Sequence, residues 1–143
     1  MARAAVVPDP ETAIRLVRAG DAEAEDLLAA DGYIFATPEN LAAMAGPMKD
    51  FFDRAYYPVL DRLNGRPYAT FVCAGTDGEN TVRQIARIAT GWRLRQVAEP
   101  IVARTGAQTM AAILAAKNIE PAVLRRCADT GAALAAGLAA GIF

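Results

Sequence analysis

The sequence predicts a three-layer α/β fold, in which a parallel β-sheet carries helices on both faces. Two short apolar runs, Gly32–Ala36 and Tyr68–Ala74, have the composition of strands that are buried on both sides. Each run is followed by a segment with apolar residues at helical spacing, the first beginning near Gly46 and the second near Asp77. This alternation of strands and helices favours a single domain, residues 1–143, built on one doubly covered sheet.

The stretch Asp31–Arg54 contains the first strand, loop and helix. Thr37 and Pro38 are expected to end the strand, because proline has no N–H for a sheet ladder. Pro47 is expected in the first turn of the helix, where a missing N–H costs nothing. The loop Thr37–Ala45 is therefore expected at the carboxyl end of a parallel strand, where open α/β sheets bind ligands.

The remaining elements follow from local patterns of apolar residues, caps and prolines. Alternation of apolar and basic residues predicts a strand early in the chain, and Pro100 marks the last strand as an edge or bulged strand. The other expected elements are a strand at Thr12–Arg18, a short helix capped by Asp21 and ending at Ala30, a strand at Gln96–Ala103, a short helix at Gln108–Lys117 and a last helix from Pro121. Trp92 is expected to cover the core at the end of the second long helix.

Composition limits the classes of function. A hydrophobic content of 54% allows a real core, and the formal net charge of −1 gives no electrostatic case for nucleic acid. Histidine is absent, which excludes Ser-His-Asp and Cys-His catalysis and histidine-ligated metals. Cys73 and Cys127 lie far apart in apolar segments, so we expect buried thiols in a reducing, cytoplasmic protein. The most apolar stretch, Gly131–Phe143, is too short to span a bilayer, so no membrane partner is expected.

The segment that follows the first strand carries a family pattern. It reads Thr37-Pro38-Glu39-Asn40 and then, at residues 46–53, GPMKDFFD. This pattern resembles the flavodoxin-like proteins, in particular the branch of NADPH-dependent FMN reductases and quinone reductases. The resemblance implies FMN as cofactor, NAD(P)H as co-substrate, a quinone or another small molecule as acceptor, and a homo-oligomer. The flavin would carry out the chemistry, and no catalytic side chain and no metal site is assigned.

The resemblance also implies which residues contact the flavin. They are Thr37, Pro38, Glu39, Asn40, Leu41 and Ala42 in the first loop, and Gly75, Thr76, Asp77 and Gly78 in the second. Both loops equally fit ordinary strand-to-helix turns, and this alternative stays open. Relatives often carry an aromatic, a glycine and an asparagine where this chain has Leu41, Ala42 and Ala43, so a stacking aromatic is expected to be missing.

One unit of the flavodoxin-like fold has no counterpart in the sequence. That fold opens with a central strand, a Ser/Thr-Gly-rich phosphate loop and a first helix, and here Met1–Val7 falls where that helix would end. Three interpretations stay open: the natural product begins upstream of Met1, Met1–Val7 fills the strand position, or a partner completes the sheet. We favour the first. The alternative function is a non-catalytic or electron-carrier domain with weak or no FMN binding.

Overall fold

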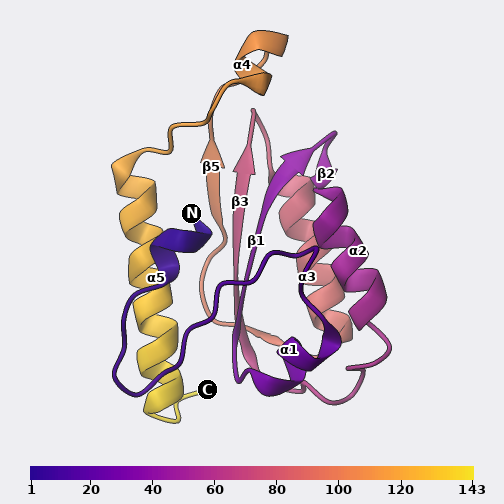
Figure 1. The fold of residues 1–143 in the computed structure, drawn as a ribbon, viewed down its shortest axis with the longest axis vertical. Coiled ribbons are helices and arrows are strands. Elements are labelled where there is room, and N and C mark those ends of the chain that lie inside the picture. Colours follow the sequence, from indigo (N-terminus) through magenta and orange to yellow (C-terminus); the bar gives the residue numbers. More distant parts are fainter.

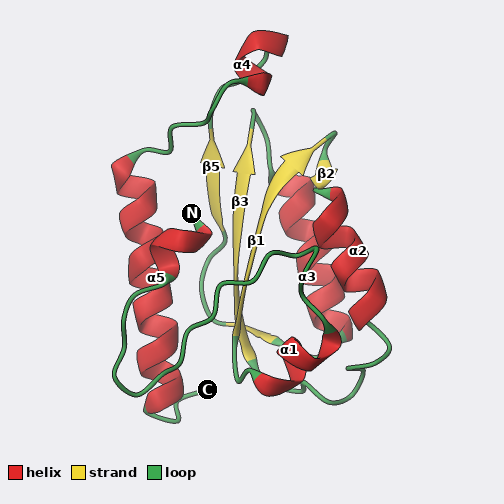
Figure 2. Ribbon diagram, viewed as in Figure 1, coloured by secondary structure: helices red, strands yellow, loops and turns green.

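The computed structural model describes residues 1–143 and shows three layers (Figures 1 and 2). The sheet consists of β1 (Tyr33–Asn40), β3 (Pro67–Ala74), β4 (Arg95–Gln96) and β5 (Ile101–Arg104), all parallel, and the two-residue β2 (Ala43–Met44), which is antiparallel to the end of β1. The helices are η1 (Ala2–Ala5, a 3₁₀ helix), α1 (Ala24–Ala29), α2 (Gly46–Ala55), α3 (Glu79–Gly91), α4 (Met110–Leu114) and α5 (Pro121–Ala139). The expected flavodoxin-like arrangement of a mostly parallel sheet between helices is confirmed.

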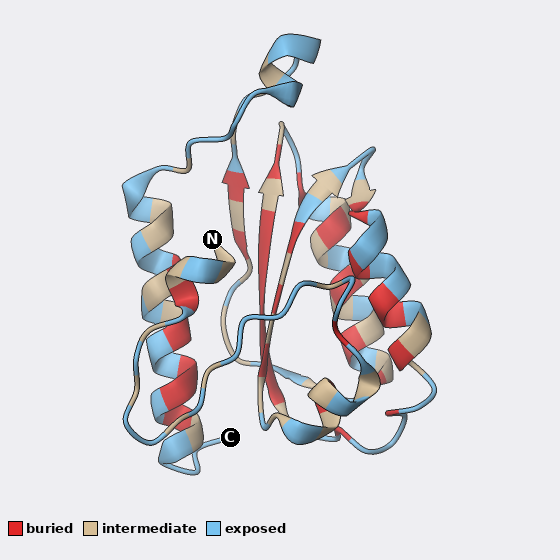
Figure 3. Cartoon of the chain, in the orientation of Figure 1, coloured by how far each residue is buried: buried red, intermediate tan, exposed pale blue.

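Each face of the sheet has its own core. Side chains of β1 alternate between the faces: Tyr33 and Phe35 point to the side covered by α2 and α3, where they join Phe52 and Trp92. The opposite face is covered by α5 and η1, and there Cys127 belongs to a smaller core. Figure 3 shows the buried residues concentrated in the strands and on the inward sides of these helices. The expectation that Trp92 is buried in the core is confirmed, since its side chain is fully buried.

The strand β1 has a strand neighbour along only one full edge. It pairs in parallel with β3 from Tyr33 to Pro38, whereas on its other edge it pairs only with β2, at Glu39 and Asn40. An open edge of this kind agrees with the expectation that a central strand has no counterpart in the sequence. The interpretation that Met1–Val7 fills the strand position is wrong, because this segment forms η1 and packs on α5.

The expected end of the first strand is wrong, because β1 continues through Thr37 and Pro38 to Asn40. The Pro38 carbonyl accepts the Ala45 N–H at 3.1 Å, so the backbone of Pro38 faces β2 and the open edge. Backbone polar groups alternate between the two edges of a strand, and the missing N–H of Pro38 therefore costs no bond to β3. The strand passes the proline because that position faces the open edge.

Two expectations for the first thirty residues are also wrong. Thr12–Arg18 forms no strand, and the bond from Thr12 Oγ1 to the Ala135 carbonyl, at 3.2 Å, ties it to α5 instead. A segment with a strand pattern forms no strand when no neighbouring strand is present to accept and donate its backbone hydrogen bonds. The short helix α1 begins at Ala24 rather than after Asp21, because Glu23 caps it: the Glu23 N–H donates to the Asp26 carboxylate at 3.0 Å.

The second half of the chain follows the predicted order more closely. The single strand expected at Gln96–Ala103 is wrong, because residues 97–100 separate β4 from β5. Both short strands pair only with β3, which confirms the expected edge position. The helix α5 begins at Pro121 as predicted, and its Gly131 lies against the backbone of Ala5 in η1 rather than on the sheet. The helix α4 is shorter than Gln108–Lys117 and stands away from the sheet with no buried residue (Figure 3). None of the helices combines the length and the apolar character needed to cross a membrane.

Candidate ligand site at the carboxyl end of the sheet

The two loops predicted to bind a ligand lie next to each other. The strands β1 and β3 are adjacent and parallel, and Pro38 and Cys73 form their last pair, so both chains leave the sheet at the same end (Figure 1). A third segment, the connection from β5 to α4, reaches the same end. There the Thr105 N–H donates to the Ala74 carbonyl at 2.9 Å, and the Gly106 N–H donates to the Gly75 carbonyl at 2.8 Å. The sequence analysis did not include this third segment. It could have been found, because a last strand parallel to the others also ends at this edge of the sheet.

The first loop is a tight β-hairpin rather than an open loop. Its two central residues, Leu41 and Ala42, have φ values of 52° and 60°. Two-residue hairpins with both central φ angles positive usually carry asparagine and glycine, because other residues are strained there. The side chain of Leu41 is fully exposed at the tip of this hairpin.

The first turn of α3 holds the hairpin in place. The Asn80 side-chain amide donates to the Ala42 carbonyl at 2.6 Å, and the Thr81 hydroxyl donates to the Glu39 carboxylate at 3.3 Å. One turn later, Gln84 Oε1 accepts a backbone N–H of β2 at 3.0 Å. These three side chains were not among the predicted site residues, because their role depends on contacts between segments distant in the sequence.

The second loop is fixed by a cap and by an arginine. Gly78 is the N-cap residue of α3 with φ of 91°, and Asp77 Oδ1 accepts the Glu79 N–H at 3.3 Å. Arg104, at the end of β5, donates from Nε to the Asp77 carbonyl at 3.0 Å and from Nη2 to the Glu79 carboxylate at 2.7 Å. The loop is thus tied to the neighbouring strand as well as to its own helix.

Backbone donors gather at this end of the sheet without protein partners. The N–H groups of Leu41 and Ala42 in the hairpin, and of Thr76, Asp77 and Gly78 in the second loop, donate no hydrogen bond within the chain. Uncharged N–H donors on two adjacent loops suit a ligand that presents carbonyl or ring-nitrogen acceptors. The exposed Leu41 side chain adds an apolar contact beside them.

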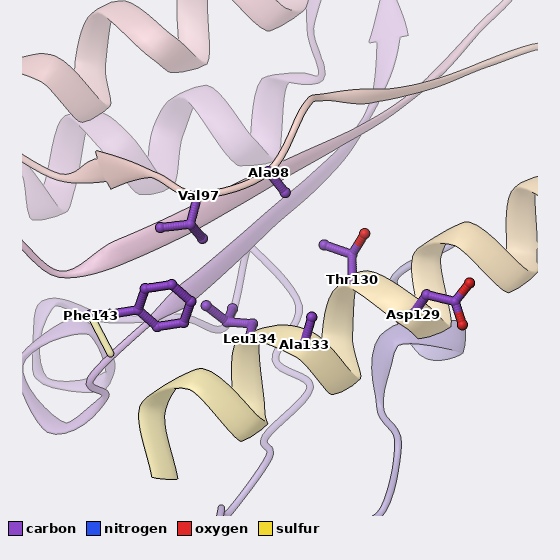
Figure 4. A pocket seen from close by; sticks show the side chains of 7 residues that line it. All are labelled: Val97, Ala98, Asp129, Thr130, Ala133, Leu134 and Phe143. Atoms are coloured by element: carbon purple, nitrogen blue, oxygen red, sulfur yellow. The ribbon is translucent and has the colours of Figure 1, made fainter. Parts of the chain in front are cut away.

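Two cavities lie elsewhere in the molecule. One, of about 250 Å³, opens between α5 and the connection from β4 to β5 (Figure 4), and the other, of about 230 Å³, lies between α2 and α3. The residues that line the first are Val97, Ala98, Asp129, Thr130, Ala133, Leu134 and Phe143. None of the ten predicted residues lines either cavity. The geometry of the strand ends, rather than a deep cavity, therefore defines the candidate site.

The thiols take no part in the candidate site. Both cysteines are free, and Cys127 is buried in the core between α5 and the sheet. Burial raises the pKa of the Cys127 thiol, which keeps it protonated and unreactive. Cys73, which lies in β3, is only half-buried, so the expectation of a fully buried thiol is wrong for this residue. Its neighbours Val72 and Ala74 are buried.

The strained hairpin gives a first prediction. Replacing Leu41→Asn together with Ala42→Gly should raise the free energy of unfolding by about 1 kcal/mol, because this pair accepts positive φ. Urea unfolding followed by circular dichroism measures the change. Ala42→Gly alone is the matched intermediate and should give part of the gain. Equal or lower stability in the double variant would show that the hairpin is not strained.

The mostly parallel sheet, covered by helices on both faces, has the arrangement of the flavodoxin-like fold. The model of the NADPH-dependent FMN reductase family matches residues 10–109, and the chain belongs to this family. The resemblance inferred from the strand, the Thr37-Pro38 pair and the following helix is thereby confirmed. No curated protein matches the chain in sequence.

Solved structures show the same fold at low sequence identity. A WrbA-like flavodoxin from Agrobacterium tumefaciens matches with a TM-score of 0.64 and 18% identity, over 82% of this chain and 71% of that one. An NADPH-quinone reductase from P. pentosaceus matches with a TM-score of 0.53 and 17% identity, over 84% of this chain and 77% of that one. The general stress protein 14 from Treponema denticola was solved in complex with FMN. It matches with a TM-score of 0.50 and 15% identity, over 82% of this chain and 70% of that one. At these identities the likeness concerns the fold.

Proposed function

We propose that the chain is a flavin-binding oxidoreductase that uses NAD(P)H to reduce a quinone or another small acceptor. Membership in the NADPH-dependent FMN reductase family supports the reaction class. The observation that carries the proposal is the set of unpartnered backbone N–H groups on two adjacent loops at the carboxyl end of the sheet. The ten residues predicted to contact the flavin are Thr37–Ala42, at the end of β1 and in the hairpin turn, and Gly75–Gly78 in the second loop.

The isoalloxazine ring of FMN fits this arrangement. The ring carries two carbonyl oxygens and unprotonated ring nitrogens, which can accept hydrogen bonds from the N–H groups of Thr76, Asp77 and Gly78. Its apolar edge can cover Leu41, a large apolar side chain that is fully exposed without a ligand. A bound flavin supplies the hydride-transfer chemistry, while the chain orients the ring by backbone contacts. This division of labour needs no acid or base among the side chains.

The hairpin must be held beside the second loop for both to reach one ring. Asn80 provides this support through its bond to the Ala42 carbonyl, at 2.6 Å. Thr37 supports the base of the hairpin, since its hydroxyl oxygen accepts the Ala45 N–H at 3.2 Å. Asn80 and Thr37 are therefore proposed as positioning residues of the flavin site.

A direct experiment tests flavin binding. FMN is added to the purified chain, and quenching of flavin fluorescence together with a shifted absorbance spectrum reports a complex. Oxidation of NADPH or NADH in the presence of a quinone then distinguishes a reductase from an electron carrier. A folded chain that binds no flavin would favour the alternative function, a non-catalytic flavodoxin-like domain that acts through protein contacts.

A pair of asparagine variants gives the second prediction. Asn80→Ala should weaken flavin binding by about fivefold, because losing the hydrogen bond that holds the hairpin costs about 1 kcal/mol. Asn64→Ala is the matched control, since Asn64 is exposed in the connection between α2 and β3 and should leave the affinity unchanged. Fluorescence titration measures both dissociation constants. Equal affinities in the two variants would remove Asn80, and with it the hairpin, from the flavin site.

A further inference from the structure

The charged side chains at the carboxyl end of the sheet are mainly acidic. Glu39 in β1, Asp77 in the second loop and Glu79 in the first turn of α3 bring three carboxylates to this end. Arg104 is the cation tied to them, and its Nη2 donates to the Glu79 carboxylate at 2.7 Å. This group of four side chains, which we call the acidic rim, carries a net charge of −2.

Two of the positive groups near the acidic rim, Arg104 and Lys117, are already used, and a third, Arg83, is exposed one turn after Glu79 in α3. The Nε atom of Arg104 donates to the Asp77 carbonyl at 3.0 Å. Lys117, the next cation along the chain, donates to three carbonyls at the end of α4, those of Ala112, Ile113 and Ala115, at 2.6–2.8 Å. The positive end of the α3 dipole is likewise complemented, because Glu79 lies in the first turn and Asp77 accepts its N–H.

The unpartnered donors are uncharged backbone N–H groups, whereas the side chains around them repel an anion. A ligand bound here gains from neutral acceptors and loses from a phosphate placed within a Debye length of the acidic rim. The FMN phosphate carries close to two negative charges at neutral pH. The residues at the site therefore fit the ring of FMN and do not fit its phosphate.

We infer that this site recognises the uncharged isoalloxazine ring and binds riboflavin at least as tightly as FMN. The inference rests on the proposed flavin-binding function and names the substrate class of the same site. It follows that the chain accepts flavins irrespective of what is attached to the ribityl chain, and that added salt improves binding of FMN but not of riboflavin.

Parallel fluorescence titrations with riboflavin and FMN test the inference. At about 10 mM ionic strength, FMN is expected to bind about five- to tenfold more weakly than riboflavin, because the net charge of the acidic rim repels the doubly charged phosphate across roughly 10 Å of water. At about 1 M salt, where the Debye length is about 3 Å, the two affinities should become equal. FMN binding about tenfold tighter than riboflavin at both salt concentrations would overturn the inference and leave the proposed function standing. Binding of neither flavin would overturn both.

A charge variant sharpens the test. Glu79→Gln removes one carboxylate from the acidic rim and frees the Nη2 group of Arg104, so FMN should gain about twofold or more in affinity at low salt. Riboflavin affinity should change by less than about twofold, because the bond from Arg104 Nε to the Asp77 carbonyl still holds the second loop. Glu25→Gln in α1 is the matched control, because Glu25 is exposed on the helix that precedes β1, at the opposite end of the sheet. An equal change for both flavins, or the same change in the control, would contradict recognition of the ring alone.

Discussion

Trp92→Ala is expected to lower the free energy of unfolding by about 3–5 kcal/mol, as truncation of a fully buried aromatic residue usually does. The indole ring lies 5.4 Å from the ring of Phe52 and 5.8 Å from that of Tyr56, between α2 and α3. Its N–H donates to the Tyr56 carbonyl at 3.1 Å. Removing it opens a cavity and leaves that carbonyl without its partner, so two unfavourable effects add.

Two further variants separate packing from the hydrogen bond. Trp92→Phe keeps an aromatic ring and should cost only about 1–2 kcal/mol, for lost volume and one hydrogen bond. Tyr57→Ala is the control, because this neighbouring aromatic is 79% exposed and its truncation should change stability by less than about 0.5 kcal/mol. Urea unfolding is followed by far-ultraviolet circular dichroism, since Trp92 is the only tryptophan. A Trp92→Ala variant as stable as Tyr57→Ala would show that the core between α2 and α3 is packed differently.

Local sequence patterns predicted an element correctly where that element packs against the neighbours that its pattern implies. The apolar runs that became β1 and β3 are enclosed by helices on both faces, and their composition reports this burial. Because the two strands are parallel and adjacent, their carboxyl ends also had to bring the two predicted loops together. The fold class and the position of the candidate site could therefore be predicted without the structure.

The features that sequence missed depend on neighbours distant in the chain. Thr12–Arg18 has the pattern of a strand but no strand beside it, and Pro38 is tolerated in β1 because its backbone faces the open edge. Leu41 gives no local sign that its φ is positive. The anchoring roles of Asn80 and Arg104 likewise appear only when separate segments are brought together.

Gly78→Ala is the second substitution with a large expected effect, and it links the fold to the site. Gly78 has φ of 91°, and a Cβ atom added there would lie 2.6 Å from Val102 Cγ1 and 3.2 Å from Ala74 Cβ. Strain of the backbone and the clash with β3 and β5 together should lower the free energy of unfolding by about 3 kcal/mol. The substitution also displaces the loop that carries the Thr76 and Asp77 N–H groups.

A matched glycine isolates the contribution of the clash. Gly65 has a similar φ of 80°, but a Cβ atom there would meet no atom within 4 Å, so Gly65→Ala should cost only about 1 kcal/mol of backbone strain. Combining Gly78→Ala with Val102→Ala should recover about 1 kcal/mol relative to the sum of the single variants, because the closest clashing atom is removed. If Gly78→Ala costs no more than Gly65→Ala, or if the double variant shows no recovery, the loop and β5 are not in contact. The proposed ligand site would then lose the rigid strand end on which its second loop depends.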